Sequence, residues 1–183
     1  MRNKSSIAIA VLTAIVVATA VIVYAGRPQA GQPMADCPMQ HMHDQHRAGL
    51  NERGAQAMGF DQTKTTHHFR LTTEGGVIKV EANDPSDTGS RDQIRQHLIH
   101  ITRMFAEGNF DAPLLVHTRL PPGVRVMQRL KTRIGYTFES TRQGGYVRIS
   151  TSDPEVLAAI HEFLRFQIKN HQTGDPLEVK PVS

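Results

Sequence analysis

Tryptophan is absent from this chain, cysteine occurs once, and aromatic residues make up only 5% of the 183 positions. A single cysteine excludes an internal disulfide framework and any Cys-x-x-Cys metal or redox motif. The formal net charge is only +4, and Arg2 and Lys4 account for two of these positive charges. Electrostatic nucleic-acid binders display a dense basic face, so we expect no nucleic-acid partner.

Short catalytic motifs are also missing from the sequence. It contains no Walker phosphate loop, no Gly-x-Gly-x-x-Gly fingerprint and no His-Glu-x-x-His zinc motif. Catalytic residues can lie far apart along a chain, so this absence does not exclude an enzyme. No catalytic residue is therefore assigned, and the sequence favours a non-enzymatic role.

One long apolar segment is present, at the N-terminus. Residues 7–25 are 19 consecutive uncharged positions, and Arg2 and Lys4 precede them. Such a run nearly spans a bilayer core of about 30 Å, and its basic start keeps the N-terminus cytoplasmic. The same features are typical of a signal peptide cleaved after Ala25. Either alternative, a membrane anchor or a signal peptide at 1–25, places the rest of the chain in the cell envelope: periplasmic or extracytoplasmic, membrane-anchored or secreted.

The remaining chain divides into three predicted segments. Residues 26–62 carry eight glycines and prolines with no helix or strand period, which predicts a flexible tether with one short helical turn near 51–58. Residues 63–173 are long enough for one modest core. Residues 174–183 contain two prolines and are predicted to be loose.

An internal repeat with an offset of 69 residues lies within 63–173. Each copy has alternating apolar residues around a Gly-Gly pair, which predicts a β-hairpin with the glycines at its turn. An Asp-Pro pair then predicts a helix start. The matching pairs are Gly75-Gly76 with Asp84-Pro85, and Gly144-Gly145 with Asp153-Pro154.

These patterns predict an α+β fold. Duplicated hairpin-helix (ββα) units form a four-stranded antiparallel sheet with two helices, near 90–107 and 154–170, on one face. A short helix is expected after Pro121-Pro122-Gly123. The period of two residues gives the strand faces directed at the helices. They are His67, Phe69 and Leu71 with Ile78, Val80 and Ala82, and Tyr136, Phe138 and Ser140 with Val147, Ile149 and Thr151.

The densest group of metal-ligating side chains lies in the predicted tether. Residues 37–46 hold one cysteine, two methionines, three histidines and an aspartate. Thiolate, thioether and imidazole groups suit copper(I), and imidazoles also bind copper(II) and zinc. The predicted metal ligands are Cys37, Met39, His41, His43 and His46. Copper is the expected ion and zinc the alternative; a histidine-rich linker that binds no specific metal is equally compatible with this composition.

Two short segments resemble known families. Cys37-Pro38-Met39-x-His41 resembles the Cys-Pro-Met-His heavy-metal-binding segment of copper and silver efflux proteins, with Gln40 inserted. Residues 138–142 resemble the Ser-Thr-Arg phosphate loop of aspartate and ornithine carbamoyltransferases. That loop opens a helix, whereas here it falls in a predicted hairpin and is followed by Gln143. The chain is also shorter than that two-domain enzyme, so we do not expect carbamoyltransferase activity.

A second group of histidines belongs to the predicted domain. His97, His100 and Met104 follow helical spacing along one flank of the first helix, and His67 points inward from the first strand. These residues predict either a metal or catalytic site or half-buried structural histidines. His117, His161 and His171 are interpreted as structural or solvated.

Three functions remain open from the sequence. The leading one is an exported or membrane-anchored envelope protein that binds or handles a soft metal such as copper. The second is a small ligand-binding or protein-interaction domain with no metal role, and its protein partner is not specified. The third is an envelope enzyme that uses the region of His67, His97 and His100.

Overall fold

The computed structural model describes the backbone of residues 38–181, with side chains at Gln45 and from residue 48 onward. Within the described range, the residues from Met42 onward form one compact unit. The apolar run at 7–25 and Cys37 lie outside the described residues. Among the helices in the described range, none has the length and apolar character needed to cross a membrane.

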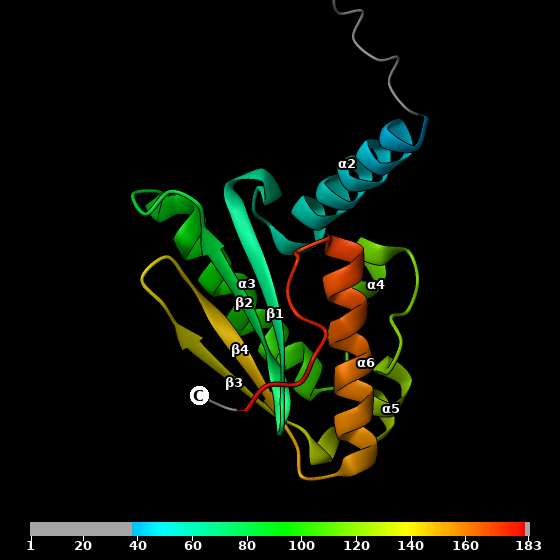
Figure 1. Ribbon diagram of the computed structural model, residues 1–183. Helices are drawn as coiled ribbons and strands as arrows, with labels where there is room; N and C mark the ends of the chain where they lie inside the picture. The colour runs from blue at the N-terminus through cyan, green and yellow to red at the C-terminus, as the bar shows by residue number, and fades with distance from the viewer. Residues whose placement is uncertain (1–37, 182–183) are drawn as a thin grey trace, which may run out of the picture. The chain divides into compact units, whose positions relative to one another are not determined.

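The fold is α+β, as the sequence predicts. Four strands form one antiparallel sheet in the order β1-β2-β4-β3 (Figure 1). The strands are β1 (Thr65–Thr72), β2 (Gly75–Ala82), β3 (Gly135–Ser140) and β4 (Gly144–Ser150). Each hairpin is followed by a long helix, α3 (Thr88–Ala106) or α6 (Pro154–His171). That the two hairpin-helix (ββα) segments are duplicates of each other stays a prediction from the sequence.

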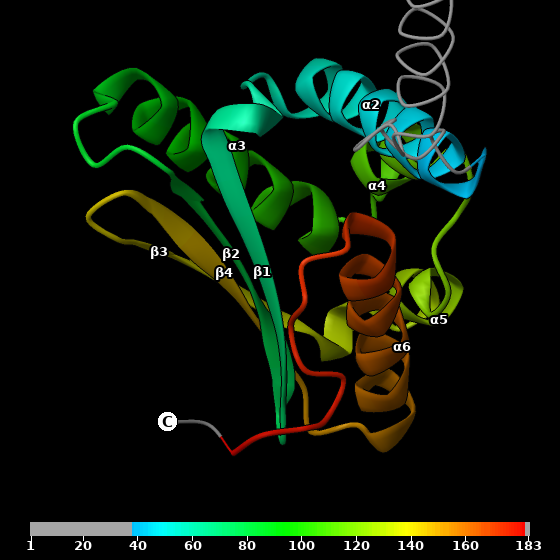
Figure 2. The same ribbon diagram turned by 45° about the horizontal axis from the view of Figure 1, so that its top comes forward.

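Both long helices pack on the same face of the sheet (Figure 2). α6 contacts β1 and β2, while α3 contacts β2, β4 and β3. The register places Phe69, Ile78, Val147 and Phe138 in one row across all four strands. Phe69, Ile78 and Val147 are buried, and Phe138 packs against them from the edge strand. The predicted inward face is therefore confirmed for this row, whereas Ser140 at the end of β3 is exposed.

The Gly-Gly pairs lie in the strands and not at the turns. Gly75-Gly76 begins β2 after a turn at Thr73 and Glu74, and Gly144-Gly145 begins β4. A Cβ atom on Gly76 would lie 2.2 Å from Leu164 Cδ1 of α6. The hairpins are as predicted, but the glycine at 76 serves the close approach of the helix to the sheet.

Aspartates begin both long helices. Asp153 accepts hydrogen bonds from the backbone N–H groups of Glu155 and Val156, as the Asp-Pro pair predicts. At the start of α3 the cap is Asp87, three residues after Asp84. Its side chain accepts a hydrogen bond from the backbone N–H of Ser90. The short helix α5 (Val124–Arg129) follows Gly123 as expected, with Val124 and Met127 buried.

The structure differs from the predicted tether. Helix α2 spans Pro38–Met58, and a 3-10 turn, η1 (Gln62–Lys64), leads into β1. Leu50 and Phe60 are buried, and the Arg53 guanidinium donates a 2.9 Å hydrogen bond to the Val116 carbonyl. The compact unit therefore starts well before residue 63, because residues 50–60 contribute to its core.

The structure also differs from the predicted loose tail. The backbone N–H of Lys180 donates to the Leu71 carbonyl at 3.0 Å, next to the edge strand β1. Asp175 accepts hydrogen bonds from Phe69 N–H and from the His68 ring, each at 2.9 Å. Residues 175–180 thus cover the free edge of β1, which protects its unpaired backbone groups.

Candidate ligand-binding site

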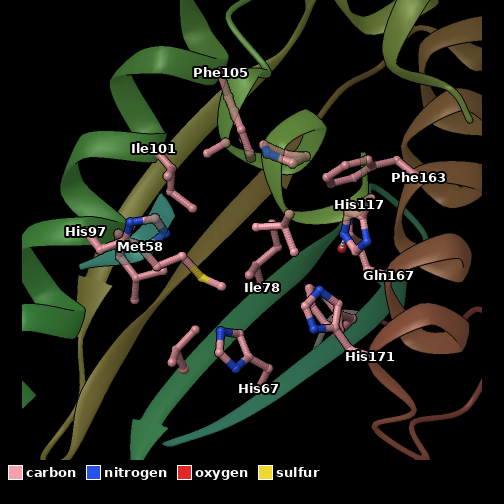
Figure 3. Close-up of a pocket in the computed structure, with 16 residues that line it drawn as sticks. Met58, His67, Ile78, His97, Ile101, Phe105, His117, Phe163, Gln167 and His171 are labelled. Atoms are coloured by element: carbon pink, nitrogen blue, oxygen red, sulfur yellow. Dashed lines mark hydrogen bonds between the residues drawn. The ribbon is translucent and has the colours of Figure 1, made fainter. Parts of the chain in front are cut away.

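A cavity of about 60 Å³ lies between the sheet and the helices (Figure 3). We call it the histidine cavity. Its walls are mostly apolar side chains from β1, β2, α3 and α6, including Phe69, Ile78, Ile101, Phe105 and Phe163, and α2 adds the thioether of Met58.

Four imidazole rings line this cavity, each from a different element (Figure 3). His67 lies on β1 and His97 on α3. His117 is the last residue of α4 (Asp111–His117), and His171 is the last residue of α6. Residues more than 100 positions apart in sequence therefore meet around one small apolar space.

Ring contacts fix the positions of these imidazoles. His171 stacks on His67 with centroids 5.7 Å apart, and it meets His117 edge-to-face at 5.0 Å. Phe60 stacks on His67 at 6.1 Å and contacts His97 edge-to-face at 5.6 Å. Such offset-stacked and edge-to-face pairs are the favoured aromatic geometries, so the cavity wall is pre-organised.

The His117 ring has a hydrogen-bond partner at both nitrogens. Its Nδ1 lies 2.7 Å from Asn170 Oδ1, and its Nε2 lies 2.8 Å from Gln167 Oε1. A neutral imidazole donates at one nitrogen only, so at the other nitrogen the amide must turn its NH₂ group toward the ring. His117 is therefore engaged within the protein and supports the wall of the cavity.

Burial keeps the cavity imidazoles neutral at pH 7. It lowers the pKa of His67 to about 4, and the neighbouring His68 contributes to this shift. Burial likewise lowers the pKa of His97 to about 4, helped by His67 and His100. The pKa values of His117 and His171 also lie below the ordinary value, again mainly through burial. Neutral rings offer one N–H donor and one lone pair each.

One fully enclosed ring nitrogen of the cavity has no hydrogen-bond partner. The Nε2 atom of His67 is fully enclosed and makes no hydrogen bond. Among the described side chains only the Tyr136 hydroxyl shares this condition, and Tyr136 does not line the cavity. Buried polar atoms are nearly always satisfied, so this nitrogen is a hydrogen-bonding group that a water molecule or a small guest in the cavity would satisfy.

The side chains of the predicted metal cluster lie outside the described residues. Cys37 lies outside the described residues, and for Met39, His41, His43 and His46 only the helical backbone of α2 is described. In the part of the chain where side chains are described, no three His, Cys, Asp or Glu residues are grouped so that they could hold a metal ion.

The structure separates the histidines that the sequence grouped on the first helix. His97 lines the cavity, whereas His100 is exposed and does not. Met104 packs against the hydrophobic core. Of the trio His67, His97 and His100, the first two therefore share the cavity wall, and His100 lies outside it.

Two cavity histidines were not assigned to a site from the sequence. His117 and His171 were interpreted as structural or solvated, and the structure places both at the cavity. A signal for His171 existed, because positions 160, 164, 167 and 171 follow the buried stripe of α6. His161 is structural as predicted: its Nε2 lies 2.9 Å from the Thr72 carbonyl.

The segment that resembles the carbamoyltransferase phosphate loop forms the β3–β4 turn. Ser140 ends β3, residues 141–143 make the connection, and Gly144 begins β4. No helix follows the turn directly, so these residues lack the helix N-terminus that holds phosphate in such loops.

Known proteins give no further guide to this site. Neither the protein-family models, nor the curated proteins, nor the solved structures contain a match to this chain.

Proposed function

We propose that this domain binds a small, uncharged and largely apolar molecule in the histidine cavity. The orphaned Nε2 atom of His67 is the observation that carries this proposal. A guest with one hydroxyl or carbonyl group would satisfy that nitrogen, while its apolar part would fill the space beside Ile78 and Phe105.

The chemistry of the cavity selects against charged guests. Its four imidazoles are neutral near pH 7, and its other walls are mostly apolar. Moving a charged group from water into such surroundings is costly unless an opposite charge meets it. The described lining residues include no Asp, Glu, Lys or Arg, so no such partner is available.

The test is a titration of the full chain with 1-butanol, followed by NMR. We expect saturable binding of 1-butanol and weaker binding of butyrate, which has the same chain length and a negative charge. Replacing His67→Phe keeps a ring but removes the nitrogen, so 1-butanol affinity should fall about threefold to tenfold, the worth of one hydrogen bond. His100→Phe, at an exposed position of α3, is the control and should leave the affinity unchanged. Equal affinities for the parent and His67→Phe would contradict the proposal.

A second function is favoured by the composition of residues 37–46. We propose that Cys37, Met39, His41, His43 and His46 capture a soft metal ion, copper(I) first and zinc as the alternative. One thiol, two thioethers and three imidazoles within ten residues support this proposal. Metal capture and cavity binding use different residues, so each function can be tested without disturbing the other.

We propose that both functions operate in the cell envelope. The support is the apolar run at 7–25 with Arg2 and Lys4 before it, which is typical of an anchor or signal peptide.

A further inference from the structure

A second, more polar cleft adjoins the histidine cavity. Its volume is about 360 Å³, within the range of roughly 300–1,000 Å³ that is usual for small-molecule sites. His67 and His171 line both spaces. These two stacked rings therefore form the boundary between the apolar cavity and the polar cleft.

The cleft is lined by neutral hydrogen-bonding groups. α2 contributes Asn51, β1 contributes Thr65 and Thr66, and the end of α6 contributes Asn170. The described lining residues include no Asp, Glu, Lys or Arg. The Thr65 and Thr66 hydroxyls already donate hydrogen bonds within the protein, to the Asp61 and Gln62 carbonyls and to Asn83 Oδ1, so toward a guest they act as acceptors. Together with amide groups, which donate and accept, such acceptors suit a guest rich in hydroxyl groups and carrying no charge.

We propose that the ligand is an amphiphile with an uncharged, hydroxyl-rich head, such as a sugar, in the cleft and a short apolar end in the histidine cavity. This inference rests on the proposed function, because it assigns the apolar end to the same cavity. The cleft is the larger space, at about 360 Å³ against about 60 Å³, so the head is the larger part of the ligand.

The test compares n-butyl glucoside, 1-butanol and glucose as ligands of the full chain. The glucoside should bind at least about tenfold more tightly than 1-butanol, because two or more added hydrogen bonds each contribute a factor of a few. Glucose alone should bind more weakly than the glucoside, since it leaves the apolar cavity empty.

A matched pair of variants on α2 locates the head. Asn51→Leu removes a hydrogen-bonding group from the cleft with little change in volume, and Gln45→Leu changes an exposed position on the same helix. Asn51→Leu should lower glucoside affinity about threefold to tenfold and leave 1-butanol affinity unchanged. Gln45→Leu should alter neither affinity. The unfolding midpoint of each variant establishes that it is folded.

Three other results would contradict either the position of the head or cavity binding itself. Equal binding of the glucoside and 1-butanol overturns the inference about the head and leaves the proposed function in place. Tighter glucoside binding that Asn51→Leu does not affect also overturns the inference, because the head then lies elsewhere. Binding of neither compound overturns both the inference and the proposed function.

Discussion

Lowering the pH from 7 to 4 should reduce the free energy of unfolding by several kcal/mol. In the unfolded chain, histidine takes up a proton near its ordinary pKa of 6.5, whereas folded His67 and His97 do so only near 4. Between these values the unfolded state binds more protons, so stability is full above about pH 6.5 and is lost as the pH falls toward 4. Each ring accounts for about 3 kcal/mol.

The loss of stability caused by the histidines occurs at a higher pH than the loss caused by the carboxylates. Hydrogen bonds to Ser90 lower the pKa of Asp87, and the Arg133 guanidinium lowers that of Asp153. The stability that these groups contribute is present above 3.8, their ordinary pKa, and is lost only at lower pH. Glu81 also has a lowered pKa, from an ordinary value of 4.5, so the part of the window above that value reports on the histidines.

Denaturant unfolding at several pH values measures the effect. Replacing His67→Phe should reduce the loss of stability between pH 7 and 4 by about 3 kcal/mol, since one buried titrating ring is gone. His100→Phe, at an exposed position, should keep the profile of the parent. Identical profiles for the parent and His67→Phe would show that His67 is not held neutral by burial.

Replacing Cys37→Ser should weaken copper(I) binding by at least about a hundredfold. Loss of a group that merely orients a metal ligand costs about 10–100-fold in affinity, and removal of the thiolate deletes a ligand itself. Affinity should also fall in acid, because thiol and imidazole ligands must lose their protons to bind. Competition with a copper(I) chelator measures both effects on the full chain.

The copper titration needs controls within the same chain. Replacing His100→Gln, outside both the cluster and the cavity, should leave copper(I) affinity unchanged. A truncation at residue 63 is not a valid control, because it would remove buried Leu50 and Phe60 from the compact unit. Unchanged affinity in Cys37→Ser would assign copper binding to other residues, and no binding by the parent would remove the metal function.

The sheet and its long helices were predictable because their signals are local. Alternation within each strand, together with the short turn between β1 and β2, places Phe69 and Ile78 on one face, and the stripe of α6 follows from a period of 3.6 residues. The Asp-Pro pair at 153 also has a local meaning, since Asp153 caps the helix that follows it. These interactions span only a few residues.

The sequence does not predict helix α2, because the helix is stabilised by contacts with residues far away in the chain. Its sequence has no continuous apolar stripe, and Gly49 and Gly54 are typical of a linker. In the structure Leu50 is buried, Met58 lines the cavity and Arg53 binds the Val116 carbonyl 63 residues away. A local pattern carries no information about such contacts.

The candidate site was predictable only in part, for the same reason. The strand period directs His67 inward and the helix period places His97 at the edge of the apolar stripe, and both line the cavity. His117 and His171 join them only because α4 and α6 end at the same point of the fold. The sequence offers no rule for that convergence, nor for the lack of a partner at His67 Nε2.

The most direct measurement is a ¹H–¹⁵N spectrum of the histidine rings of the full chain, recorded with and without 1-butanol. We expect the Nε2 resonance of His67 to move in proportion to the bound fraction, because this atom gains a hydrogen-bond partner. The rings of His100 and His161, which lie outside the cavity, should not move. An unchanged His67 resonance under conditions of saturation, or equal shifts at all histidines, would contradict the binding site.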